Sequence, residues 1–390
     1  MGTLQEQARP RLAYLDNIKW TMIIMVVLVH ASVTYSGIGS WFYKEPSSLD
    51  TVAKLVFSFY ESLSQAFFMG ILFFIAATFV PGSYDRKGFG KFVLDRCIRL
   101  GVPVLIFMLV LDPLIRLLRD AFSGHSPSLP VLASGYMTAI RTGAVVSATG
   151  PLWFALALLV FSILYALVRL VAGQNARPSQ PHLTARSISL GAGALIATIA
   201  AGSFLVRLVQ PIGTAWFNMQ LCFFPQYIVL FLVGLWAGRT HLLEHIPSNV
   251  GATWLRLAFA VGVPLWFILF GLGGAMHSKT LDVFFGGLHW QAAGYAAWEA
   301  FFAVSISLGL IVLYRERASA PTRVTSFLSR TSFGVYSFHA PILVAISLAL
   351  RAWVVYPLAK AGLVAALAFA ASLVVAALIR RAPGLGRLFA

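Results

Sequence analysis

Charged residues are scarce in this chain. They make up 11% of its 390 residues, whereas hydrophobic residues make up 59% and the mean hydropathy is +0.83. A soluble protein carries about a quarter charged residues, so this composition excludes an ordinary soluble domain and predicts a polytopic membrane protein. The net charge of +16 would suggest nucleic-acid binding in a soluble protein. In so apolar a chain it is typical of membrane topology, and we expect no nucleic-acid partner.

Cysteine is almost absent. Cys97 and Cys222 form no CxxC motif, no metal-ligand spacing and no secreted disulfide framework. We expect both to be packing residues, and we expect no metal site. The first ten residues also lack the apolar core and the cleavage site of a signal peptide, so the first apolar segment is expected to act as the targeting signal.

Long apolar runs dominate the chain instead. About 20 apolar residues suffice for a helix to cross a bilayer. Ten such segments are expected, at about 16–37, 54–80, 97–118, 151–172, 187–207, 219–238, 254–275, 292–314, 332–351 and 357–379. The sequence shows no repeat and no appended soluble domain. It therefore predicts an all-α integral membrane protein, a single bundle and domain over residues 1–390 with tails at 1–13 and 380–390.

The basic residues predict the orientation of this bundle. An even number of spans places both termini on one side of the membrane. The loops on that side carry 20 Lys and Arg residues, and the loops on the other side carry 9. The positive-inside rule therefore predicts that both termini are cytoplasmic.

The first span contains Lys19 at its start and His30 well inside it. Eleven residues of helix correspond to three turns, roughly 16 Å, so both side chains lie on one face, which Asp16 shares. An ionisable residue inside a bilayer is costly and by default marks a functional site. The alternatives are a structural bond from His30 to a neighbouring helix, and a Lys19 that only reaches the lipid headgroups.

Glu299 shares the predicted depth of His30. Each lies about seven residues from the outer end of its span. A carboxylate bonded to one imidazole nitrogen fixes the tautomer and raises the basicity of the other nitrogen. We therefore expect Glu299 to orient His30, the alternative being a protonated carboxyl bonded to a backbone carbonyl. Glu61, a further carboxylate within a span, receives no predicted role.

An arginine pair marks the cytoplasmic start of the third span, in the segment DRCIRLGVP. Arg96 and Arg99 are neighbours on one helix face, and Pro103 cannot donate to the carbonyl of Arg99. Two guanidinium groups suit a phosphate-bearing ligand, because each can bond its oxygens in bidentate fashion. The alternative is simple anchoring to lipid headgroups, which the spacing alone favours.

Two more residues are candidates. His339, beside the helix-loosening Pro341, is expected in the inner half of its span, nearer the arginine pair than His30 is. A packing role for His339 is an equal alternative. Trp153, at the outer start of the fourth span, is a candidate substrate contact or an interfacial aromatic residue.

The motifs together resemble the acyltransferase 3 family. In order along the chain they are LDNIKW with His30, FFMGILFFIAATF, DRCIRLGVP, PLWF, WEAFF and YSFHAPIL, covering about residues 11–380. The resemblance is closest to the branch without an appended esterase-like domain, which includes periplasmic glucan succinyltransferases. Two departures stand out: Lys19 replaces the usual arginine, and Ala77–Thr78 replaces a Ser–Gly pair.

This resemblance implies a multi-pass enzyme of the bacterial inner membrane. Such an enzyme would transfer an acetyl or succinyl group from cytoplasmic acetyl-CoA or succinyl-CoA to a hydroxyl of a glycan or other acceptor reached from the periplasm. By resemblance, His30 would be general base or transient acyl carrier, assisted by Glu299. Donor binding would fall to the residues Arg96, Arg99, Lys19 and His339. The acyl group, the acceptor and the oligomeric state stay open.

Two other functions are compatible with the composition. A proton-coupled transporter of a small anionic solute would also use buried ionisable groups and a basic cytoplasmic face. Against it, the two halves show no matched pair of spans broken by glycine or proline. A scaffold protein would leave His30 and Glu299 unexplained.

Overall fold

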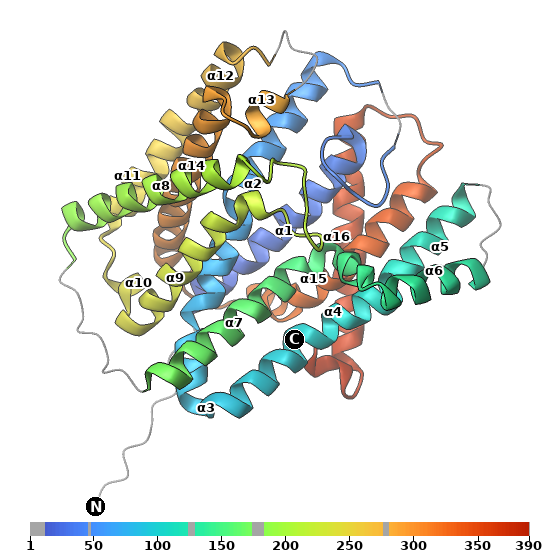
Figure 1. Ribbon diagram of the computed structural model, residues 1–390, viewed down its shortest axis with the longest axis horizontal. Helices are drawn as coiled ribbons and strands as arrows, with labels where there is room; N and C mark the ends of the chain where they lie inside the picture. The colour runs from blue at the N-terminus through green and yellow to red at the C-terminus, as the bar shows by residue number, and fades with distance from the viewer. Residues whose placement is uncertain (1–11, 46–47, 124–128, 174–182, 276–280, 390) are drawn as a thin grey trace, which may run out of the picture.

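The computed structural model describes residues 12–45, 48–123, 129–173, 183–275 and 281–389 (Figure 1). Within these residues, ten helical segments are long and apolar enough to cross a membrane. The prediction of an all-α membrane bundle is thereby confirmed, and the described residues contain no β-structure beyond one isolated bridge, Trp216 to Met219. The ten segments are α1 (Ala13–Ser36), α2 (Thr51–Thr78), Val80–Phe122, Ala144–Ala172, α8 (Ala185–Arg207), Leu221–Thr240, Ser248–Leu272, α14 (Trp290–Arg317), α15 (Arg323–Ala349) and α16 (Pro357–Arg381).

Several of these segments are compound. The third joins α3 (Val80–Arg96), η1 (Cys97–Gly101), α4 (Val102–Ile106), η2 (Phe107–Leu111) and α5 (Asp112–Phe122). The fourth joins η3 (Ala144–Leu152) to α7 (Trp153–Ala172), and the sixth joins η4 (Leu221–Phe223) to α9 (Phe224–Thr240). The seventh joins α11 (Ser248–Leu257), η5 (Ala258–Gly262) and α12 (Val263–Leu272). The short helices α10 (Leu242–His245) and α13 (Asp282–Phe285) and the turn η6 (Leu385–Arg387) lie outside the spans, as does α6 (Leu129–Arg141).

Proline explains the wide turns inside these spans. The π-helical segments η1, η2 and η5 end just before Pro103, Pro113 and Pro264. A proline cannot donate to the carbonyl four residues earlier, and its ring clashes with that carbonyl. Widening the preceding turn relieves the clash without breaking the helix. The predicted opening at Arg99 is therefore present as the π-turn η1.

The core of the bundle is built around α1. This helix packs against α2, α14, α15 and α16. Polar side chains tie it to its neighbours: Asn17 Nδ2 donates to Ala318 O at 2.8 Å, and Thr21 Oγ1 lies 2.9 Å from Tyr314 Oη. Next to it, α9 packs tightly on α2, because Gly234 and Gly238 leave no space for a β-carbon against residues 74–78. Ala77 and Thr78, which stand where the family has a Ser–Gly pair, therefore lie against glycines of the neighbouring helix α9.

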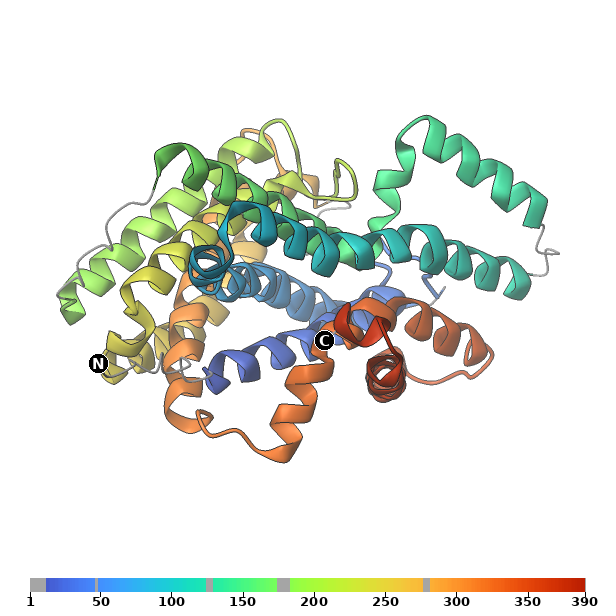
Figure 2. The same cartoon turned by 90° about the horizontal axis from the view of Figure 1, so that it is seen from below.

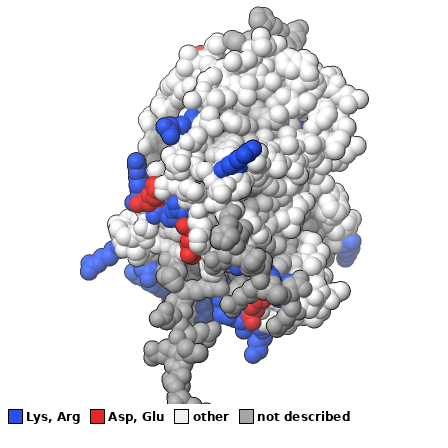
Figure 3. All heavy atoms as spheres, turned by 90° about the vertical axis from the view of Figure 1, so that its left-hand side faces the viewer, with Lys and Arg blue, Asp and Glu red and all other residues white. Residues whose placement is uncertain are grey.

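The surface supports a bilayer environment. Large apolar side chains are exposed on the outer helices, among them Leu164, Val168, Val171, Leu205 and Phe259. In water so many exposed apolar side chains would be unfavourable, whereas lipid tails cover them at no cost. Figure 3 shows the basic side chains of one face gathered towards its lower part, the end at which α1 begins in Figure 1.

The helices α5 and α6 form a hairpin at one edge of the molecule (Figures 1 and 2). Asp112, at the first turn of α5, is 2% exposed and accepts hydrogen bonds from two side chains. Arg116 Nε lies 2.7 Å from the Asp112 carboxylate, and the Tyr136 hydroxyl of α6 donates to the same oxygen. This carboxylate therefore joins the two helices.

The distribution of Lys and Arg predicts which loops face the cytoplasm, and chemical labelling can test this prediction. Residues 86–91 are expected to face the cytoplasm and Lys44 the opposite side, with His125, which lies outside the described residues. In a background of Cys97→Ser and Cys222→Ala, a membrane-impermeant thiol reagent added to intact cells should label Lys44→Cys but not Lys87→Cys. Labelling of position 87 but not of position 44 would show that the orientation is the opposite of the one predicted.

Candidate functional site

The structure brings His30 and His339 together. His30 lies on α1 and His339 on α15, and His30 Nδ1 is 2.8 Å from His339 Nε2. The two rings are nearly parallel, with centroids 5.0 Å apart. His339 Nδ1 in turn lies 2.7 Å from the carbonyl oxygen of Tyr336, one turn earlier on α15. Two helices that are distant in sequence thus share a chain of hydrogen bonds.

These hydrogen bonds determine which ring nitrogens carry the protons when His30 and His339 are both neutral. A backbone carbonyl can only accept, so His339 Nδ1 carries the proton and His339 Nε2 is an acceptor. His30 must then donate from Nδ1, which leaves its Nε2 unprotonated. Among the described residues, His30 Nε2 has no hydrogen-bond partner. His339 is fully buried, whereas His30 keeps part of its surface accessible. The result is a free base at the accessible end of the pair.

The contact predicted between His30 and Glu299 is wrong. Glu299 of α14 is 3% exposed and forms an ion pair with Arg207, the last residue of α8. Instead of Glu299, His339 forms the hydrogen bond to a ring nitrogen of His30, at Nδ1. Equal depth in the membrane does not fix the direction in which a side chain points around its helix. Arg207 was missed because it lies at the very end of a span and was counted among the loop residues.

The depth predicted for His339 is also wrong. The helix α15 begins at Arg323, nine residues before the expected start of the span. His339 therefore lies beyond the middle of its helix and at the level of His30, which it contacts. A longer helix than the apolar run indicates is the physical reason, since the first turns of α15 are polar.

Trp41 covers His30. The two rings are stacked with centroids 3.9 Å apart and an interplanar angle of 11°. Phe42 contacts Trp41 edge-on at 5.0 Å and faces Phe107 of η2 at 6.3 Å. An aromatic ring against an imidazole also stabilises the protonated form of that imidazole, through the negative face of the ring.

The segment that carries Trp41, residues 37–45, is anchored at its far end. Glu45 N donates to Thr34 O at 2.9 Å, and the Lys360 ammonium of α16 lies 2.7 Å from the Glu45 carboxylate. Lys360, 2% exposed, also donates to Trp353 O at 2.8 Å. Sequence reasoning missed this segment because it has no helical period. The one signal was a lysine within the first turn of an apolar span.

A second segment closes the site from the side of α7. The Tyr336 hydroxyl donates to Pro151 O in η3. The neighbouring Gly150 has φ of +48°, a conformation that favours glycine, and packs against Phe107. Asn218 Nδ2 donates to Gly150 O at 2.8 Å. The residue whose carbonyl orients His339 therefore also fixes η3.

Glu61 joins α2 to α1 near the same end of the bundle. Its carboxylate accepts hydrogen bonds from Ser32 and Ser36 of α1, at 2.6 and 2.7 Å. These serines follow His30 on the same helix. Glu61 thus fixes the last turns of α1.

The arginine pair lies at the junction of α3 and η1. Arg99 is 60% exposed, and its Nε is 3.0 Å from Asp95, which also binds Lys87 at 2.8 Å. The Arg96 guanidinium lies 5.1 Å from the centroid of the Phe92 ring. Arg99 therefore presents a largely accessible guanidinium group.

Within the described residues, the contacts of Lys19 and of Trp153 are with residues other than His30 and His339. Lys19 forms an ion pair with Asp16 at 2.5 Å and lies 5.8 Å from the Phe79 ring centroid. Trp153, the first residue of α7, stacks on Tyr227 with centroids 5.7 Å apart and packs near Phe73. Trp153 is thus part of an aromatic cluster beside η3.

Comparison with known proteins agrees with this arrangement. The family model described as an acyltransferase domain, acyltransferase 3, matches residues 12–381. No curated protein and no solved structure matches the chain. The matched region runs from the start of α1 to the end of α16 and so includes every candidate residue above. The chain belongs to the acyltransferase 3 family and is a multi-pass membrane acyltransferase.

Proposed function

We propose that this enzyme uses cytoplasmic acyl-CoA to acylate a hydroxyl of a glycan, or of a similar acceptor, that approaches from the opposite side of the bacterial inner membrane. The acyl group is of the acetyl or succinyl class. The observation that carries the proposal is the order of hydrogen bonds from Tyr336 O through His339 to His30. It leaves an accessible, unprotonated His30 Nε2, the atom that acyl transfer requires.

In this mechanism His30 Nε2 takes the proton of the acceptor hydroxyl while the hydroxyl oxygen attacks the thioester carbonyl. The new C–O bond forms as the C–S bond breaks, and the proton passes from His30 to the departing thiolate of CoA. His339 Nε2 accepts the Nδ1–H of the imidazolium, and the face of Trp41 stabilises its positive charge. In the alternative, Nε2 attacks the thioester carbonyl, and the C–S bond breaks to release the thiolate of CoA as the C–N bond forms. The acceptor hydroxyl then attacks this acyl group, the C–N bond breaks, and the hydroxyl proton neutralises the thiolate.

The donor phosphates would be bound by Arg96 and Arg99, with Lys19 close to the same side of the membrane. Asp95 engages only Nε of Arg99, so the remaining N–H groups of this exposed guanidinium are available to a ligand. Guanidinium groups suit phosphate because they donate in pairs.

Arg99→Lys is therefore expected to weaken acyl-CoA binding by about ten- to a hundredfold, because charge-assisted hydrogen bonds are worth about 1.5–3 kcal/mol each. Isothermal titration of purified protein with acetyl-CoA or succinyl-CoA measures this. The control is Arg256→Lys, since Arg256 is an exposed helical arginine bonded to the backbone carbonyl of Ala252. Equal affinity in both variants would return Arg99 to a role in topology alone.

The overall reaction is tested with protein in liposomes. Labelled acyl-CoA is supplied on the side of the termini and the acceptor glycan on the other side. Acylated glycan is the expected product. Transport of an intact solute without any acylated product would contradict the proposal and favour a transporter.

A further inference from the structure

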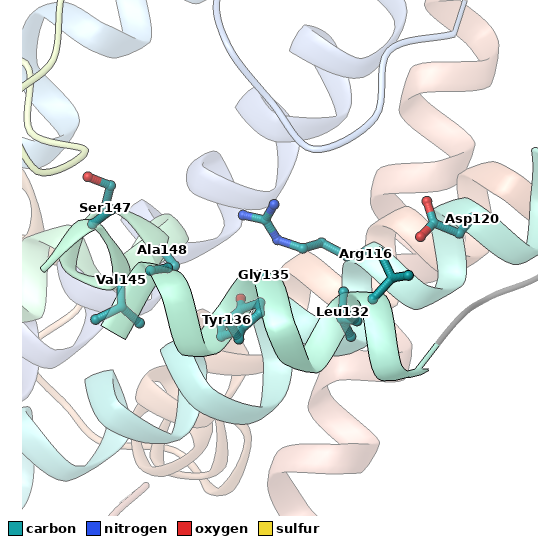
Figure 4. Close-up of a pocket in the computed structure, with 11 residues that line it drawn as sticks. Arg116, Asp120, Leu132, Gly135, Tyr136, Val145, Ser147 and Ala148 are labelled. Carbon is teal, nitrogen blue, oxygen red and sulfur yellow. The ribbon is translucent and has the colours of Figure 1, made fainter. Parts of the chain in front are cut away.

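A pocket of about 460 Å³ lies outside the histidine site, between α5, α6 and η3 (Figure 4). It is open to the surface. Arg116 and Asp120 line it from α5, Gly135 and Tyr136 from α6, and Ser147 from η3. Figure 4 shows the Arg116 side chain reaching from α5 towards the Ser147 end of the pocket.

Two of these side chains are held in place by Asp112. The buried Asp112 carboxylate accepts from Arg116 Nε and from the Tyr136 hydroxyl. Arg116 is nevertheless 52% exposed, and its guanidinium lies 5.8 Å from the Tyr136 ring centroid. Burial, together with the bond to Asp112, raises the pKa of the Tyr136 hydroxyl, which therefore keeps its proton. The pocket thus has a fixed guanidinium donor and a fixed aromatic ring.

The pocket shares a wall with the histidine site. Ser147 lines the pocket, and Pro151 of the same segment η3 accepts the hydrogen bond from Tyr336. The carbonyl of Tyr336 in turn holds His339. Helix α5 also packs on α15, which carries His339. If each span crosses the bilayer once, the pocket lies on the side where α1 ends, and Phe42 of the segment after α1 lies against Gly150 of η3.

The chemistry of the lining indicates its ligand. Arg116 donates, Asp120 accepts, and the Ser147 hydroxyl can do both. With Asp112 bonded to Arg116, the carboxylates outnumber the cation by one, so a phosphate or carboxylate ligand would be repelled. Sugar hydroxyls both donate and accept, and the faces of sugar rings pack on aromatic and apolar surface. These properties fit a neutral carbohydrate.

We propose that the pocket between α5, α6 and η3 binds neutral sugar units of the acceptor glycan beside the unit that is acylated. This inference rests on the proposed function, because it assigns the acceptor-binding site of that reaction. The expected ligands are neutral sugars, and the residues that select them are Arg116, Asp120 and Tyr136.

Gly135 provides a test that leaves the rest of the fold unchanged. It is exposed within α6, and a β-carbon there would meet no other atom within 4 Å. The Gly135→Trp variant should therefore fold, with a slight gain in helix propensity, while its indole fills the pocket. Gly193→Trp is the matched control, because Gly193 is equally exposed and open in α8. Asp120→Asn removes a carboxylate from an exposed position and tests the polar contact separately.

The probe is an array of neutral and anionic oligosaccharides, read with fluorescent nanodiscs that contain the full-length protein and no acyl-CoA. We expect wild type and Gly193→Trp to bind neutral oligosaccharides, Gly135→Trp to lose this binding, and Asp120→Asn to bind more weakly. Binding by Gly135→Trp at the wild-type level would overturn the proposal. Binding confined to anionic sugars, or no binding by wild type, would do so as well.

Glycan binding and acyl transfer, measured on the same variants, distinguish a failure of this proposal from a failure of the proposed function. Neutral glycan binding that is lost in Gly135→Trp, in a protein that transfers no acyl group from acyl-CoA, would support the pocket and contradict the donor. Acyl transfer that proceeds normally in Gly135→Trp would support the reaction and contradict the pocket.

Discussion

His30→Ala is expected to lower acyl transfer by at least about 10²–10⁴-fold, the usual contribution of a general base. If His30 instead carries the acyl group, transfer should cease altogether. In both cases acyl-CoA binding should stay at the wild-type level. The candidate phosphate ligands lie at the junction of α3 and η1, on the side of the membrane where α1 is expected to begin, whereas His30 lies towards the end of α1. Transfer is measured by mass spectrometry of the glycan, and donor affinity by titration.

His245→Ala is the matched control for this variant. His245 is exposed in the short helix α10, and its Nδ1 is bonded to the carbonyl of His241. Its removal should change neither transfer nor donor binding. Transfer at the wild-type rate by His30→Ala would end the catalytic assignment.

His339 should act through His30 as a positioning residue. His339→Gln can keep an acceptor near His30 Nδ1, whereas His339→Leu removes it and leaves that N–H without a partner. We therefore expect the leucine variant to lose far more turnover than the glutamine variant, with KM for acyl-CoA little changed in both. Equal losses in the two variants would indicate that His339 contributes only packing.

The sequence predicted the parts of this structure that depend on one-dimensional patterns. Apolar runs gave the ten spans, and Pro103 gave the opening of the helix at Arg99. His30 was found because an ionisable side chain inside a span is costly and therefore conspicuous. These features are local, so they can be read along the chain.

Partner choice could not be predicted in the same way. Depth placed His30 and Glu299 at one level, but the direction of a side chain around its helix depends on how the helices pack. His339 was placed too deep because the polar first turns of α15 lie outside the apolar run. Trp41 and the ion pair of Glu45 with Lys360 belong to a segment without helical period, which gives no pattern to read.

The pair of Arg207 and Glu299 leads to the largest expected effect on stability. Arg207 is fully buried, and its guanidinium lies 5.5 and 5.6 Å from the ring centroids of Phe223 and Tyr295. Its Nε and Nη1 atoms have no hydrogen-bond partner, so Glu299 alone balances the charge by direct bonding within the described residues. Removing one member of such a pair leaves an uncompensated buried charge, which costs about 3–5 kcal/mol.

Glu299→Met and Arg207→Met should therefore each lower the melting temperature in detergent strongly, whereas the double variant Arg207→Met/Glu299→Met should regain most of the loss. Replacing both ions by apolar groups removes the unpaired charge together with the cost of desolvating it. Unfolding followed by intrinsic tryptophan fluorescence measures this order. Loss in the double variant equal to the sum of the two single losses would show that the residues act independently.

Activity of the double variant then separates structure from catalysis. If Glu299 serves only to balance Arg207, the folded double variant should transfer acyl groups at a rate near that of wild type. A double variant that is stable, binds acyl-CoA normally and transfers nothing would instead show that the Arg207–Glu299 pair takes part in the reaction. The double variant separates the two roles because it restores the fold without restoring either charged group of the pair.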